Sequence, residues 1–211
     1  MANLFTITNV LGSVATNCYT IVNQDTREAV VVDPAARGDF LIDMYNKQNI
    51  KPVACLLTHG HFDHIGAVGE LRRNYPDLVV YAGKEEEELL ASQRLNLSSA
   101  FGFSMSEKAD RYVWDGEMIS VLGTNMKCIH VPGHTIGGYA YYFEEEKLVF
   151  TGDTLFACSV GRSDFPTGDG DALLKNIEDK LLTLPDDVLV YPGHNEKTTI
   201  KKEKSNNPYF F

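Results

Sequence analysis

Short apolar runs recur along the chain, most of them ended by glycine, proline, asparagine or aspartate, and they predict β-strands. The run Val-Ala-Cys-Leu-Leu after Pro52 is typical, since it is short, continuous and bounded by a breaker. Turns at 23–26 and 144–146 join two pairs of strands as hairpins. Strands are predicted at 4–8, 17–23, 29–32, 53–58, 77–82, 112–114, 118–121, 126–131, 139–143, 147–151 and 188–191.

Apolar residues spaced three and four apart predict helices between some of these strands. Strands followed by strand–helix alternation occur twice along the chain. Two mixed sheets with helices on their outer faces would accommodate that order, so the predicted fold class is α+β. The helices are predicted at 39–49, 65–73, 83–91, 171–184 and 195 to about 204.

One long segment, residues 92–109, follows neither periodicity. It mixes serine, asparagine and glycine with Phe101 and Phe103. It is either a loop or set of short helices that covers a functional site, or a plain surface connection. Just before it, the four glutamates Glu85 to Glu88 are predicted to form a solvent-exposed face near a helix N-terminus, where acidic groups are favourable.

The composition is that of an ordinary globular protein, with 44% apolar and 23% charged residues. A length of 211 residues fits one domain, residues 1–211, with a sizeable core. The net charge of −10 disfavours binding to nucleic acid or to an anionic membrane. We find neither a signal peptide nor an apolar stretch of membrane-spanning length, and therefore expect a cytoplasmic protein.

Three histidines and an aspartate crowd into six residues where a predicted strand passes into a helix. His59 and His61 are two residues apart, so in extended backbone their side chains point the same way. Asp63 and His64 come from the turn into the helix. Burying so many titratable groups without compensation is costly, and a pair of metal ions would compensate them.

Three further donors follow strands in the second half of the chain, each beside glycine: His134, Asp153 and His194. The remaining histidine, His130, lies inside a strand and is predicted to be a hydrogen-bonded structural residue. We therefore expect one site at the rim of the sheets. We assign one metal ion to His59, His61 and His134, the other to Asp63, His64 and His194, and a bridging role to Asp153.

Each ion then keeps room for a shared water, as catalytic sites do. Two divalent cations carry four positive charges, of which the two aspartates and a bridging hydroxide remove three. The remaining positive charge should attract a small anionic substrate. A nitrogen and oxygen donor set without thiolate suits zinc, which we expect, and also iron or manganese.

These motifs resemble the metallo-β-lactamase superfamily of metallohydrolases, and the resemblance covers nearly the whole chain. It implies a four-layer αββα sandwich, with Asp33 supporting the ligands. The segments 131–135 and 152–156 resemble the glyoxalase II (hydroxyacylglutathione hydrolase) branch, and Gly-Arg-Ser-Asp-Phe-Pro at 161–166 resembles its short single-domain subgroup. The C-terminal helical extension that supplies much of the glutathione pocket in that branch is reduced here to a tail after Ile200.

The resemblance implies a dinuclear enzyme that hydrolyses a thioester, with Asp63 and Asp153 as catalytic residues. Arg162 is placed beside the metals, where it would clamp a substrate carboxylate or else pair with Asp164. Phe156 and Phe165 would wall the substrate pocket or belong to the core. The alternative is a mononuclear iron enzyme that oxidises a persulfide. A β-lactamase proper is less expected without a secretion signal, and the sequence does not predict an oligomeric state.

Overall fold

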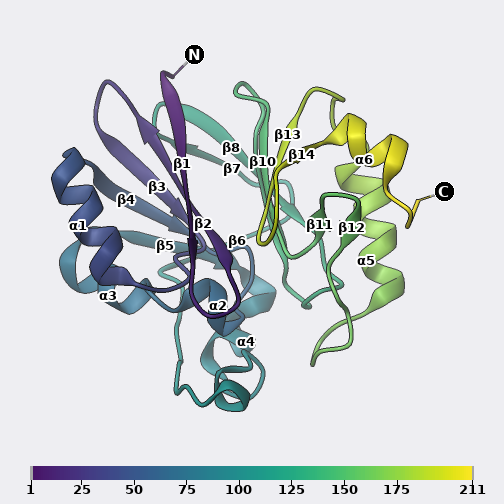
Figure 1. The fold of residues 1–211 in the computed structure, drawn as a ribbon, viewed down its shortest axis with the longest axis horizontal. Helices are drawn as coiled ribbons and strands as arrows, with labels where there is room; N and C mark the ends of the chain where they lie inside the picture. Colours follow the sequence, from purple (N-terminus) through teal and green to yellow (C-terminus); the bar gives the residue numbers. More distant parts are fainter. Residues whose placement is uncertain (1, 211) are drawn as a thin grey trace.

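The computed structural model describes residues 2–210, which form two mixed six-stranded sheets packed face to face with helices on both outer faces (Figure 1). The predicted α+β class and the αββα sandwich are thereby confirmed. In Figure 1 the first sheet and its helices lie on the left, and the second sheet and its helices on the right.

The first sheet has the strand order β1-β2-β3-β4-β5-β6. Its first three strands are antiparallel neighbours, and the pairs from β3 onward are parallel. The carboxyl ends of the parallel strands therefore meet at one edge. The strands are β1 (Leu4–Leu11), β2 (Thr16–Asn23), β3 (Glu28–Val32), β4 (Lys51–Leu56), β5 (Val79–Gly83) and β6 (Arg111–Val113).

The second sheet has the order β14-β13-β10-β9-β8-β7, in which only β10 and β13 run parallel among the described pairs. A two-stranded ribbon of β11 (Leu155–Phe156) and β12 (Ser159–Val160) follows β10. The strands of the sheet are β7 (Met118–Val121), β8 (Thr124–His130), β9 (Tyr139–Phe143), β10 (Leu148–Gly152), β13 (Leu189–Pro192) and β14 (Thr198–Thr199).

Helices cover each sheet on the side away from the other sheet, and the remaining short helices lie near the strand ends (Figure 1). The first sheet is covered by α1 (Gly38–Gln48) and α3 (Val68–Asn74). The second is covered by α5 (Gly170–Asn176), its π-helical continuation η3 (Ile177–Leu181) and α6 (Ile200–Asn206). The others are α2 (Phe62–Ile65), η1 (Lys84–Glu86), α4 (Glu87–Ala91) and η2 (Ser98–Phe101).

Successive side chains of a strand point to opposite faces of the sheet, so the apolar core is divided into layers. In β3, Val30 and Val32 face the second sheet, whereas Ala29 and Val31 face the outer helices. Tyr141, Phe143 and Phe150 supply aromatic bulk from the opposite side of the inter-sheet core. Both faces of β3 are thus apolar, which explains why this strand appears in the sequence as a continuous apolar run.

Two of the predicted helices are wrong in extent. The segment 65–73 is divided between α2 and α3 at residues 66–67, where the Ala67 backbone leaves the helical conformation and its N–H donates to the Pro34 carbonyl at 2.8 Å. The last helix begins at Ile200 rather than at 195, because residues 198–199 pair with β13 and the Thr199 side chain caps the helix.

The segment 92–109 contains η2 and is otherwise irregular. Part of it contacts α2, the short helix that follows β4. Its backbone is tied down locally, since the buried Asn96 side chain donates to the Met105 carbonyl at 2.9 Å. Within residues 2–210, no helix is long and apolar enough to cross a membrane.

Candidate metal centre

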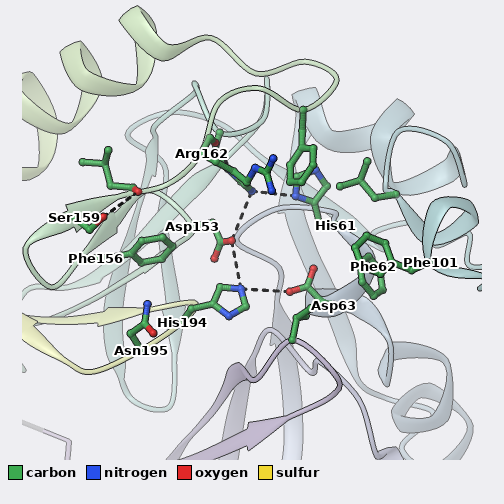
Figure 2. Close-up of a pocket in the computed structure, with 15 residues that line it drawn as sticks. His61, Phe62, Asp63, Phe101, Asp153, Phe156, Ser159, Arg162, His194 and Asn195 are labelled. Atoms are coloured by element: carbon green, nitrogen blue, oxygen red, sulfur yellow. Dashed lines mark hydrogen bonds and ion pairs between the residues drawn. The ribbon is translucent and has the colours of Figure 1, made fainter. Parts of the chain in front are cut away.

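Seven donor side chains converge where strand ends of the two sheets meet, and Figure 2 shows several of them around one pocket. In the second sheet, β8, β10 and β13 are each followed by one donor. The other four follow β4, two in the loop that enters α2 and two within α2 itself. The seven are His59, His61, Asp63, His64, His134, Asp153 and His194.

The structure groups these donors into overlapping triples whose ligand atoms lie within 4.8 Å of one another. One triple is His59, His61 and His134, and another is Asp63, His64 and His194. A third triple joins His59 and His64 to Asp153. The donors thus come together in the grouping expected from the sequence, while their role as metal ligands stays a prediction.

The first triple consists of imidazoles whose orientation is fixed by neighbours. His134 donates from Nδ1 to the Arg162 carbonyl at 2.7 Å, which turns its Nε2 toward His61. That Nε2 lies 3.0 Å from Nδ1 of His61. Nδ1 of His59 lies 3.2 Å from the Thr58 hydroxyl, so its Nε2 is the free nitrogen. A hydrogen bond on one ring nitrogen leaves the other available to a metal.

The second triple is rich in carboxylates. Asp33 accepts from Nδ1 of His64 at 2.9 Å, which leaves Nε2 of that ring 3.3 Å from Asp63 and 3.4 Å from Asp153. Nε2 of His194 lies 3.4 Å from both of these aspartates. Asp33 also accepts from the backbone and hydroxyl of Thr58, so it supports the ligand loop as the resemblance implied.

Several of these buried polar atoms have no hydrogen-bond partner among residues 2–210: Nε2 of His59, His61 and His64, and Oδ1 of Asp153. An unpartnered buried polar group costs about 1–3 kcal/mol, so four at one point would be a heavy penalty. Gly193 also lies so close to Asp153 and His64 that a side chain there would fill the space between them. This donor set fits metal ions.

The two triples differ in their electrostatics. Burial first, and then the neighbouring imidazoles, lower the pKa of His59 well below its usual value. Burial and His134 lower the pKa of His61 to about 3. Burial likewise lowers the pKa of His134. These three rings are therefore neutral at ordinary pH, which is the form that binds a metal.

In the second triple the carboxylates reverse the effect of burial. Burial alone would lower the pKa of His64, but Asp63, Asp153 and Asp33 raise it well above its usual value. Burial is likewise outweighed at His194, where hydrogen bonds to Asp153 and Asp63 raise the pKa to about 9. Three carboxylates around the His64 ring thus favour its protonated form.

Two residues that hold the donors in position were not predicted from the sequence. Thr16, buried at the start of β2, donates its hydroxyl to Oδ2 of Asp63 at 2.7 Å. Glu86, predicted as part of a solvent-exposed face, is fully buried. Its two oxygens accept from the backbone N–H of Gly60 at 2.7 Å and of Gly137 at 2.8 Å. Glu86 therefore joins the loop of His59 and His61 to the loop of His134.

The pocket over these donors has a volume of about 470 Å³ and includes the three predicted substrate residues among its lining (Figure 2). Phe165 packs edge-on against His61, and Phe156 lies edge-on to His194. Arg162 lies over the Phe165 ring at 3.8 Å and forms a bidentate ion pair with Asp164. Arg162 therefore forms the predicted ion pair with Asp164. Contact between Arg162 and a substrate carboxylate stays a prediction.

Comparisons with known proteins agree with this geometry. Residues 11–194 match the family model of the metallo-beta-lactamase superfamily. Hydroxyacylglutathione hydrolase GloC of Haemophilus influenzae is 34% identical over 196 residues, which cover 92% of each protein. The crystal structure of BLEG-1 B3 metallo-beta-lactamase is 36% identical, with a TM-score of 0.93 over 98% of this chain and 99% of that one. The crystal structure of TTHA1623 in a di-iron-bound form is 34% identical, with a TM-score of 0.85 over 96% and 99%.

Proposed function

The chain belongs to the metallo-β-lactamase superfamily of metal-dependent hydrolases, and from that premise we propose that it hydrolyses a thioester at two bound divalent cations. The thioester part of the proposal is supported by the similarity to a hydroxyacylglutathione hydrolase across 92% of the chain. The observation that carries it is the pair of overlapping donor triples, with their unpartnered buried nitrogens, at the base of an open pocket.

We assign one cation to His59, His61 and His134, the other to Asp63, His64 and His194, with Asp153 shared. When bound, such cations lower the pKa of water toward neutrality and polarise the carbonyl that is attacked. Zinc is the expected metal, and iron is supported by the di-iron form of a related structure.

The chain's own residues hold the reacting water in place. Burial would raise the pKa of Asp63, but the neighbouring His64 and His194 rings lower it far below its usual value, so the carboxylate stays ionised. Thr16 fixes one of its oxygens. Asp63 and Asp153 would accept hydrogen bonds from the attacking water and orient it toward the acyl carbon.

The test combines metal analysis with a thioester screen that includes S-lactoylglutathione. We expect close to two metals per chain and turnover of at least one thioester. Asp153→Ala should abolish activity and reduce the metal content, because both ions share this residue. About one metal per chain with no thioester turnover would refute the proposal. His130→Ala is the matched control, since His130 bonds to the Ile136 carbonyl away from the donor triples.

The same purified protein can be assayed for two other activities. The structural similarity to ETHE1 from Myxococcus xanthus, 30% identical with a TM-score of 0.81, gives weight to a mononuclear iron enzyme that oxidises a persulfide. Oxygen consumption with a persulfide substrate would identify it. The structural similarity to a protein described as a B3 metallo-beta-lactamase makes β-lactam hydrolysis the other candidate. Nitrocefin turnover faster than any thioester turnover would favour it.

A further inference from the structure

The pocket beside the donor triples has an aromatic wall that the proposed chemistry does not use. Phe62 lies between the donors His61 and Asp63 in the chain, and its ring stacks on Phe101 with centroids 4.5 Å apart and planes at 28°. Phe103 stacks on Phe62 from further out, at 5.7 Å. Figure 2 shows Phe62 and Phe101 on the opposite side of Asp63 from Phe156.

This wall is built by the segment 92–109. Leu97 and Phe101 from that segment line the same pocket as the donors, and Phe101 remains 50% exposed although its ring is stacked. A half-exposed phenylalanine at a pocket mouth leaves apolar area that a ligand can remove from water. Asn96 and Ser98, both buried and hydrogen-bonded within the segment, hold the wall in place.

The charges around the pocket are unsuited to a thiol carrier with several carboxylates. Arg162 is the one cationic side chain among the described residues that line it, and Asp164 already accepts from two of its three guanidinium nitrogens. The protein as a whole carries a net charge of −10. Outside the metal centre, a polyanionic carrier would thus meet only this one cation, which is already paired with Asp164.

We propose that the Phe62–Phe101 wall is a binding subsite for an apolar, preferably aromatic, substituent on the thiol side of the thioester. This inference rests on the proposed thioester hydrolysis and specifies its substrate class. The carbonyl would lie at the donor triples, and the substituent would cover the exposed face of Phe101. Offset stacking between aromatic rings is favourable beyond the area that it buries.

The experiment uses the metal-loaded enzyme and three lactoyl thioesters of alkyl thiols: benzyl mercaptan, N-acetylcysteamine and glutathione. The shared acyl group and the alkyl leaving groups keep the intrinsic reactivity similar. We expect kcat/KM for the benzyl thioester to exceed that for the glutathione thioester by about tenfold or more. Phe101→Ala should lower the benzyl value about fivefold and change the N-acetylcysteamine value less than twofold.

Phe40→Ala is the matched control, because Phe40 is also partly exposed, at 39%, but lies on α1 outside the pocket. Equal kcat/KM values for the three thiols, or an equal loss on all three in Phe101→Ala, would overturn the inference. If no thioester is hydrolysed, the proposed function fails and the wall is tested by calorimetry instead. Benzylthioacetate should then bind more tightly than S-methylglutathione, and Phe101→Ala should remove the difference; no difference in the wild type would overturn the inference.

Discussion

At the scale of single residues, Glu86 and His194 show how the surroundings decide what a side chain does. Glu86 belongs to a run of four glutamates, yet it alone among them is buried, with its oxygens on two backbone N–H groups. Burial raises the pKa of this carboxyl, and hydrogen bonds from the N–H groups of Gly60 and Gly137 oppose the rise. The buried Glu86 carboxylate thus holds the two donor-bearing loops in position.

Glu86→Gln should weaken metal binding and lower stability. The amide has one oxygen, so one of the N–H groups of Gly60 and Gly137 would face a donor, which costs about 1–3 kcal/mol. Zinc titration of the apoprotein and thermal unfolding measure the two effects. Glu88→Gln, an exposed change in the same run, should alter neither property. Equal metal affinity in the two variants would show that Glu86 does not position the donors.

Metal binding should release protons, because histidine rings bind a metal only in their neutral form. With a pKa of about 9, His194 carries a proton in the apoprotein at pH 7, as does His64 with its raised pKa. Proton release on zinc addition should therefore be large near pH 7 and decrease as the pH rises toward 9. Calorimetry in buffers of different ionisation enthalpy measures it. His194→Ala should release about one proton fewer, and an unchanged count would contradict the assignment.

At the scale of elements, periodicity predicted where helices and strands lie but not where they break. The interruption between α2 and α3 depends on the hydrogen bond from the Ala67 N–H to the Pro34 carbonyl, and the short strand β14 depends on pairing with β13. Both are tertiary contacts, so no local pattern reveals them. The three-histidine motif was predictable because its donors are neighbours in the chain. Thr16 reaches Asp63 across 47 positions and leaves no such local signal.

Gly66→Ala should destabilise the protein, because the added Cβ would overlap the Ala35 carbonyl between α2 and α3. Overpacking of this kind costs about 1–3 kcal/mol, which thermal unfolding would detect. Gly69→Ala is the control, since a Cβ there has Oε1 of Glu107 at 3.4 Å as its nearest neighbour. That change should be neutral or slightly stabilising within helix α3. Equal melting temperatures would show that Gly66 tolerates a side chain.

At the scale of the whole molecule, the donor set joins the two halves of the chain. The first sheet supplies four donors after β4, and the second supplies three from its strand ends. The halves also meet directly, as the Tyr139 N–H donates to the Thr58 carbonyl at 2.7 Å. The class and layers of the fold were predictable from the order of elements. The strand order in each sheet needed the coordinates.

Removing metal should therefore loosen the contact between the sheets. A ligand present at a hundred times its dissociation constant adds about 2.7 kcal/mol of stability, and two sites add more. Chelation should lower the melting temperature by about 5–10 °C, given the size of this protein. Zinc should restore it, and magnesium, which prefers oxygen donors, should not. An unchanged melting temperature after chelation would argue against a metal that bridges the sheets.

The segment 92–109 supplies none of the metal donors, and this has an evolutionary consequence. Leu97 and Phe101 shape the pocket mouth, yet their segment carries none of the seven donors. Mutations can therefore accumulate in that stretch and redirect the enzyme to new compounds while hydrolytic capacity is inherited intact. Descendants of a common ancestor could diversify in this way by exchanging one surface loop.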